Sequence, residues 1–301
     1  MWLIIALTAF FLLGLAAVMD KYLLSKAKIV PLRYAFYISV FGGLISVLLL
    51  FFVDRFSWPK DQLWLIILSG LAFYLGLYLM FLATARAEVS KVNPLVISLT
   101  PLAVFFLALG LGVEKLAFYK LGGIVLIALA SYALAHIGFK KNRLSAGIWG
   151  LVVFACLFFA LANTLNKIIY QNAPFLEAFI WLRWASAAWA LIFTFFLGGW
   201  SEVFHFKKQS KKQVHDQRLV FGLNQLAGGL GVLLLQYAIS LGSVTIVSAL
   251  NGLQIFFVMV IVYFLAKIRP HLLEEGMTPH FAHQKFFWSL ILFLGVALIL
   301  I

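Results

Sequence analysis

Residues 71–95 read LAFYLGLYLMFLATARAEVSKVNPL, and residues 226–250 read LAGGLGVLLLQYAISLGSVTIVSAL. The two stretches align without a gap at an offset of 155 residues, which places Gly76 opposite Gly231. Self-similarity at a fixed distance along a chain is the mark of a repeated structural unit. This pair of stretches therefore predicts that the fold is built from two copies of one unit.

Further matches extend the repeat over the whole chain. In chain order, the matching stretches are 17–27 with 163–173, 31–36 with 181–186 and, more weakly, 120–135 with 285–300. Their offsets rise steadily from 146 to 165 residues, as insertions in successive loops would produce. The sequence predicts one unit over residues 1–144 and a second over residues 145–301.

The composition indicates that both units lie in a membrane. Hydrophobic residues make up 64% of the chain and charged residues 11%, with a mean hydropathy of +1.06. Soluble domains have roughly 45–50% apolar and about 25% charged residues. A bilayer core needs about 20 apolar helical residues per crossing. Ten stretches meet this requirement, namely 2–19, 34–53, 63–85, 92–112, 118–137, 146–170, 176–198, 219–240, 244–266 and 286–301.

Ten crossings in two units give five crossings per unit. Because five is odd, the second unit enters the membrane from the opposite face, and the repeats are inverted. Inverted repeats are typical of secondary transporters, in which a central site opens alternately to the two sides. We expect an all-α membrane protein of two inverted five-helix repeats.

The net charge of +13 does not indicate a nucleic-acid partner. The Lys and Arg residues are scattered among short connections and form no continuous basic face. Membrane lipids with anionic headgroups are the expected counterions. The single cysteine, Cys156, lies within an apolar stretch and is expected to be a buried thiol without a disulfide. We expect no cofactor, and the sequence leaves the oligomeric state open.

The distribution of Lys and Arg predicts an orientation of the chain in the membrane. The connections on one side of the membrane carry 17 Lys and Arg, and the opposite side carries 6. The positive-inside rule would place the richer side in the cytoplasm and both termini outside. The sequence itself requires only that the two termini lie on the same side.

Residues 83–132 resemble the drug/metabolite transporter superfamily, and specifically its ten-helix EamA-type members. The features that carry the resemblance are an Ala-rich helix end followed by Thr100-Pro101, Gly112-x-Glu114 and Gly122-Gly123, with Lys21 ending the first helix and Arg33 opening the second. The resemblance implies cytoplasmic termini, a plasma-membrane location and transport of a small solute. The second half departs from the pattern, because Ile255-Phe256 replaces the Thr-Pro.

Four cations within or beside the apolar stretches are candidate substrate-binding residues. Lys21 and Lys167 occupy matching positions, as do Arg33 and Arg183. An ionisable residue inside a membrane is a functional hypothesis by default. The alternative for the two lysines is a side chain that extends to the headgroups. The alternative for Arg183 is a structural pairing with Glu177. A set of cations would suit an anionic solute.

Polar residues at helical spacing give a second group of candidates. Ser90, Asn93 and Thr100 fall on one stripe of the first unit, and Ser248 and Asn251 belong to the corresponding stripe of the second. Polar groups in a membrane helix face protein or a cavity. Substrate contact and interhelical hydrogen bonding explain these stripes equally well.

Two prolines lie beside the first stripe. Pro94 and Pro101 would free backbone carbonyls there, which the broken helices of transporters use as ligands. The second unit has no proline at the matching positions.

Asp20 and Glu88 are the carboxylates near cavity depth in the first half, and either is a candidate to carry a coupling proton. Glu88 is better explained as a helix end. His280 and His283 have a spacing that could bind zinc, but a solvated loop explains them better, and we expect no metal.

We therefore expect a secondary transporter that moves an amino acid, organic anion or other small metabolite by alternating access, and not an enzyme. Two alternatives remain. One is a membrane enzyme acting on lipid-linked substrates, for which the loops offer no convergent catalytic group. The other is an assembly subunit without transport of its own.

Overall fold

The computed structural model describes residues 1–25, 30–57, 59–87, 89–115, 117–137, 144–197, 199–204, 211–268 and 282–300. These residues form helices and connections, and none of them lies in a β-strand. The first half contains α1 (Trp2–Ser25), α2 (Pro31–Ser46), η1 (Val47–Phe52), η2 (Lys60–Gln62), α3 (Leu63–Arg86), α4 (Val89–Gly110) and α5 (Phe118–His136). The second half contains α6 (Ala146–Asn172), α7 (Phe175–Phe196), α8 (Trp200–Phe204), α9 (Lys211–Leu241), α10 (Val244–Ala249), α11 (Gly252–Ile268) and α12 (Ala282–Leu300).

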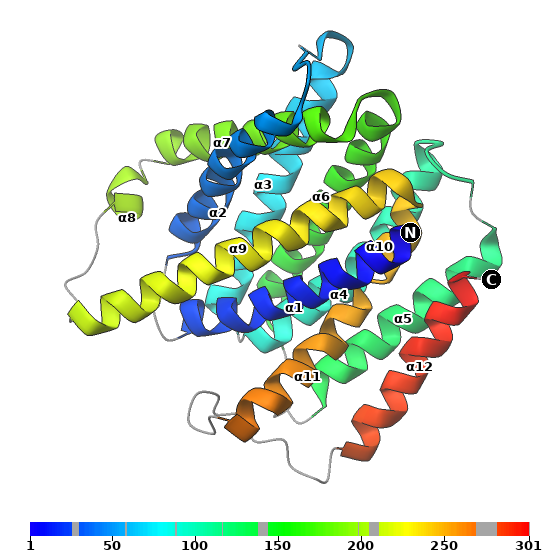
Figure 1. Cartoon of the computed structure of the whole chain (residues 1–301). Coiled ribbons are helices and arrows are strands. Elements are labelled where there is room, and N and C mark those ends of the chain that lie inside the picture. The colour runs from blue at the N-terminus through cyan, green and yellow to red at the C-terminus, as the bar shows by residue number, and fades with distance from the viewer. Residues whose placement is uncertain are drawn as a thin grey trace.

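These helices form an integral multi-pass membrane protein. Eight of the described segments are long and apolar enough to cross a bilayer, and α5 and α12 supply two shorter apolar helices. Large apolar side chains cover the outside of the bundle, as lipid requires. The N-terminus of α1 and the C-terminal end of α12 lie at the same end of the bundle (Figure 1), as the sequence requires. The fold class predicted from the sequence is confirmed.

Helix pairing can be compared between the two predicted units. When the two units are matched in chain order, α1 corresponds to α6, α3 to α9, and α4 to α10 with α11. The most extensive helix contacts are those between α1 and α9 and between α3 and α6. When each helix is replaced by its match in the other unit, one of these pairs becomes the other. The same is true of α1 with α11 and α6 with α4, whereas α2 pairs with its counterpart α7 and α5 with α12. This is the pairing that a two-fold relation between the units produces.

In one case the two matching helix pairs differ in the length of their contact, and each pair includes a helix that lines the site described below. α3 packs closely along α7, whereas the matching pair, α9 and α2, touches over a much shorter length. On the tight side, a Cβ on Gly70 of α3 would lie 2.6 Å from the Cβ of Ala185 on α7. Small residues permit such close helix approach in membranes. On the loose side, α9 contacts α2 through Phe221 and Asn224, and the pocket described below lies farther along α9.

Two local features differ from the sequence expectations. α4 runs unbroken through Pro94 and Pro101, and the interruption lies instead in the second half, between α10 and α11. There the backbone makes tight turns, with Leu253 N–H donating to the Leu250 carbonyl at 2.9 Å. Gly252 permits this path, because a Cβ there would lie 2.5 Å from Ser131 Oγ.

The second difference is the start of α9. The helix begins at Lys211, before the apolar stretch 219–240 that the sequence predicts. Lys and Gln are good helix formers, so the helix extends beyond its apolar span.

Candidate functional site

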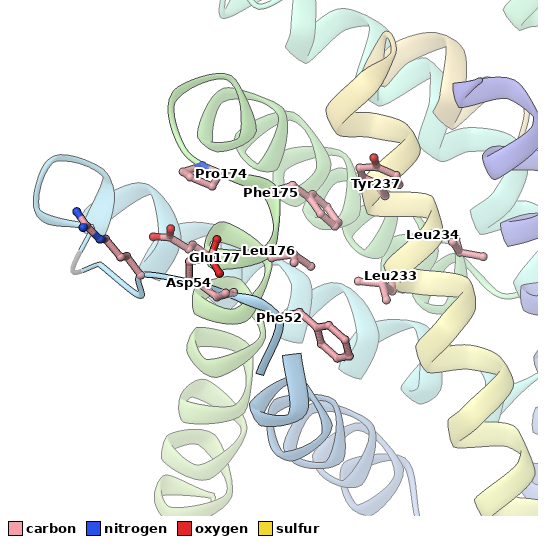
Figure 2. A pocket seen from close by; sticks show the side chains of 11 residues that line it. Phe52, Asp54, Pro174, Phe175, Leu176, Glu177, Leu233, Leu234 and Tyr237 are labelled. Carbon is pink, nitrogen blue, oxygen red and sulfur yellow. The ribbon is translucent and has the colours of Figure 1, made fainter. Parts of the chain in front are cut away.

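A pocket of about 820 Å³ opens between η1, the start of α7 and the C-terminal third of α9. Its wall is mainly apolar and aromatic, with charged side chains at one edge; the lining residues are Phe52, Val53, Asp54, Arg55, Pro174, Phe175, Leu176, Glu177, Leu233, Leu234 and Tyr237. In Figure 2, Phe52, Leu176 and Leu233 converge on the same space from three different helices. Ligand pockets have this volume and this mostly apolar character.

The rim of the pocket is held by contacts between the 53–57 connection and α7. Ser57 donates to Glu177 Oε2 from its backbone N–H at 3.3 Å and from its Oγ at 2.6 Å. Trp181 Nε1 donates to the Ser57 carbonyl at 3.1 Å, and the Trp181 ring stacks on Phe56. Glu177 is thus bonded to the rim of the pocket, and no bond joins it to Arg183 among the described residues.

A buried polar layer lies directly behind the pocket wall. Phe175 packs against Tyr237 and against Tyr170, with ring centroids 4.9 and 5.2 Å apart. Tyr170 donates to Gln236 Oε1 at 3.2 Å, and Asn166 Nδ2 donates to the same oxygen at 3.0 Å. The pocket wall is therefore backed by hydrogen-bonding side chains of α6 and α9.

Two more bonds complete this layer. Ser69 Oγ of α3 lies 2.5 Å from Asn166 Oδ1, and Gln236 Nε2 donates to Asn163 Oδ1 at 3.1 Å. The layer ties α3, α6 and α9 together at the level of the pocket. Such interhelical bonds are the usual role of amides in membrane helices.

Arg183 lies deeper in the bundle than the pocket. Its side chain is 7% exposed, and its guanidinium carbon stands 4.2 Å from the centroid of the Phe73 ring and 5.5 Å from that of Phe179. Arg183 is eight residues after Phe175, which corresponds to about 12 Å along α7 at ~1.5 Å per residue. This depth places the guanidinium near the middle of the membrane, where transporter sites are found.

Lys167 has a different environment. Its Nζ donates to the carbonyls of Ile239, Ser240 and Gly242 at 2.9, 3.2 and 2.6 Å. These carbonyls end α9, and the last carbonyls of any helix lack partners within it. The ammonium also favours the negative end of the helix dipole. Lys167 is therefore a cap for α9.

Glu114 caps the other side of the same junction. Its carboxylate accepts hydrogen bonds from Ser243 Oγ at 2.7 Å and from the backbone N–H of Val244 at 2.6 Å, at the start of α10. Gly112 makes this possible, because it adopts a φ of +67° and turns the chain at the end of α4. The Gly-x-Glu motif thus has a structural role.

N-terminal to the pocket residues of α9, polar and aromatic contacts join α1, α2 and α9. Tyr34 of α2 donates to Asp20 Oδ1, and Asn224 Nδ2 of α9 donates to the same oxygen at 2.7 Å and to the Tyr34 hydroxyl at 2.8 Å. Phe221 of α9 packs beside the rings of Tyr34, Tyr37 and Phe41, with centroids 6.0–6.3 Å apart.

Asp20 therefore belongs to this group of contacts and lies far from the pocket. Asn224 precedes Tyr237 by 13 residues, about 20 Å along α9. We call the contacts of Asp20, Tyr34, Asn224 and Phe221 the far-end seal.

Arg33 lies at the same end as the far-end seal. Its Nε donates to the Glu202 carbonyl at 2.7 Å, and Tyr37 OH donates to the Val203 carbonyl at 3.1 Å. Both carbonyls belong to the short helix α8. This contact gives Arg33 a capping role, and it does not bring Arg33 to Arg183.

The fold brings only some residues of the two predicted polar stripes close to one another. α4 packs against α10, and the buried Asn93 Oδ1, Ser248 Oγ and Asn251 Oδ1 have no hydrogen-bond partner within the described part of the chain. Thr100 Oγ1 donates back to the Val96 carbonyl of its own helix at 2.7 Å. Asn93, Ser248 and Asn251 remain predicted site residues.

The remaining predicted residues fall outside the description. The side chains of Lys21, Ser90 and His283 are not among the described ones, and Glu88 and His280 lie outside the described residues. No group of three or more potential metal ligands occurs within the described segments.

Sequence reasoning missed the residues that form the pocket and its backing. Gln236 stands alone in the apolar run GVLLLQYAIS, and an isolated amide inside a membrane span is a usable signal. Phe175 and Tyr237 carry no such signal, because aromatic residues are frequent throughout the chain.

Comparison with known proteins agrees with the fold. Residues 1–135 match the model of the EamA-like transporter family, which confirms the predicted resemblance over that part of the chain. A solved structure described only as "Crystal structure of protein" superposes with a TM-score of 0.69 at 15% identity, covering 98% of this chain and 94% of its own. At that identity the likeness concerns the fold alone. No curated protein sequence matches the chain.

Proposed function

From an EamA-like match over residues 1–135, we propose that this membrane protein is a secondary transporter that moves a small organic solute by alternating access. The observation that carries the proposal is the unequal contact of α9 with its neighbours. The pocket is open beside Leu233 and Tyr237 of α9, and the far-end seal joins α9 to α1 and α2 about 20 Å away. A transporter in one of its two states has this form.

The inequality of the two matching helix pairs supports the same proposal. α3 packs closely along α7, while the contact between α2 and α9 is much shorter. If the two units exchanged conformations, α2 would pack along α9 and α7 would part from α3. The solute site would then open at the opposite face, and the solute would not need to cross a continuous channel.

The proposed route runs through the pocket and past the polar layer. Phe52, Phe175 and Leu233 offer apolar surface, and Tyr170 and Gln236 lie behind it. A solute with an apolar body and one polar end would suit this arrangement. The proposal assigns no catalytic step to the chain.

The test is solute exchange by the purified chain in proteoliposomes. Liposomes preloaded with unlabelled solute would be exposed to radiolabelled amino acids, dicarboxylates, sugar phosphates or tetraphenylphosphonium. We expect saturable, protein-dependent exchange of at least one class. Exchange of none of them by a folded protein would contradict the proposal and favour an assembly subunit.

A matched pair of substitutions locates the route. Leu233→Trp adds an indole to the pocket wall and should abolish exchange. Leu219→Trp makes the same change on the same helix at a side chain that is 59% exposed, and should leave exchange intact. Equal exchange by the two variants would remove the pocket from the route.

A further inference from the structure

Arg183 is a buried cation, and no ion pair joins its guanidinium within the described part of the chain. Among the described residues its Nε has no hydrogen-bond partner. Two phenylalanine rings flank it. Cation–π contacts offset part of the cost of burial, but they do not pair the Nε–H donor. A buried charge without a partner is expensive.

A glycine of α2 lies next to Arg183. Gly42 faces the arginine, and even a Cβ built there would stay 3.8 Å from Arg183 Cδ and 4.0 Å from Nη1. The next residue, Gly43, has a separate packing role, since a Cβ there would lie 2.8 Å from Ala187 Cβ. The α2 backbone therefore borders the guanidinium without a side chain at Gly42.

Arg183 is connected to the pocket by one face of α7. Phe175, Phe179 and Arg183 are spaced four residues apart and share that face. The ring centroids of Phe175 and Phe179 are 5.8 Å apart, and the guanidinium follows at 5.5 Å from the second ring. Phe175 also lines the pocket. A continuous path of aromatic surface therefore leads from the pocket to the cation.

We propose that Arg183 binds the carboxylate or phosphate end of the transported solute, which is an organic oxyanion whose apolar body rests on the Phe175–Phe179 face. This inference rests on the proposed function and specifies its substrate class. A planar guanidinium matches the two oxygens of a carboxylate or phosphate with parallel hydrogen bonds. The anion supplies the missing counter-charge, and the protein has no need of an acidic residue there.

The first experiment compares ligands of the same shape and different charge. Benzoate, benzamide, benzylamine and phenylphosphonate would be added to the detergent-purified protein, and the melting temperature and binding heat measured. We expect benzoate and phenylphosphonate to raise the melting temperature, and benzamide and benzylamine to leave it unchanged. Equal shifts with benzoate and benzamide would overturn the proposal, because charge would then not matter.

Variants assign the effect to the arginine. Arg183→Gln should weaken benzoate binding by about 10- to 100-fold, since hydrogen bonds to a charged group contribute on this scale. Arg33→Gln removes the same charge from the cap of α8 and should leave the affinity unchanged. If Arg183→Gln does not fold, Arg183→Lys retains a cation without the planar fork, and we expect an intermediate loss. Unchanged binding by a folded Arg183 variant would overturn the proposal.

A lipid headgroup carries the same oxyanion chemistry, and a third arm separates the two sources. Phosphatidylglycerol would be titrated into the detergent micelles in place of the soluble anions. Stabilisation by phosphatidylglycerol alone, lost in Arg183→Gln, would assign the anion to lipid and overturn the solute assignment. If the proteoliposomes exchange a neutral or cationic solute while no anion stabilises the wild type, this inference fails and the proposed transport function stands.

Discussion

Replacing Lys167 with methionine separates a capping role from a solute-binding role. The ammonium donates to three carbonyls that end α9, at 2.6–3.2 Å. Each hydrogen bond to a charged group contributes ~1.5–3 kcal/mol. Methionine has similar length and no longer requires a buried charge, which offsets part of the loss. We expect a net destabilisation of about 2–4 kcal/mol, because the carbonyls are left unpaired.

The assay is the melting temperature of the detergent-purified variant, measured with and without benzoate. A loss of this size corresponds to a decrease of roughly 5–10 °C for a chain of this length. Lys167→Arg is the matched control, since it keeps the charge and the donors, and should lose less. The increase in melting temperature that benzoate produces should be the same in Lys167→Met as in the wild type. An unchanged melting temperature together with the loss of that increase would refute the capping role and place Lys167 in the solute site.

Two further predictions concern helix packing and the far-end seal. Gly123→Ala should destabilise the protein by about 1–3 kcal/mol, because its Cβ would lie 2.7 Å from a side-chain carbon and 2.9 Å from a backbone oxygen of α12. Gly122→Ala, which meets nothing within 4 Å, should be neutral in the same melting assay; equal losses would contradict this packing. Tyr34→Phe removes a hydroxyl that donates to Asp20, and should increase amide hydrogen exchange of residues 219–225. Unchanged exchange there would mean that the hydroxyl does not hold the seal.

The sequence was sufficient for the fold because the fold follows from local patterns. Apolar stretches about 20 residues long predict crossings, and the match of 71–95 with 226–250 predicts a repeat. The resemblance carried by Gly112-x-Glu114 is explained by a turn and a cap.

The site was less predictable because its contacts join residues far apart in the chain. Lys167 matches the pattern of an intramembrane cation, and only the position of the end of α9 shows that it is a cap. The far-end seal joins Asp20 to Asn224, which are 204 residues apart. Arg183 was identified from the sequence as a candidate, but its lack of a described partner is visible only in three dimensions.

The positions of the prolines did not predict which helix is interrupted. Pro94 and Pro101 lie within a continuous α4, whereas the interrupted segment has no proline and turns just before Gly252. Close packing of Gly252 on Ser131 fixes that turn, and such tertiary contacts have no local signature.

Alternating access requires that the pocket and the far-end seal open in turn, and distances between spin labels measure this at both ends. One pair, Asp54→Cys with Leu234→Cys, spans the pocket, and the other, Phe41→Cys with Leu223→Cys, spans the far end. A Cys156→Ser background removes the buried native thiol.

Distance distributions would be measured by double electron–electron resonance in nanodiscs, with and without a solute that the proteoliposomes exchange. We expect opposite changes, in which the distance of the pocket pair shortens as that of the far-end pair lengthens. Changes in the same direction, or no change at either end with a transported solute, would contradict alternating access by this route.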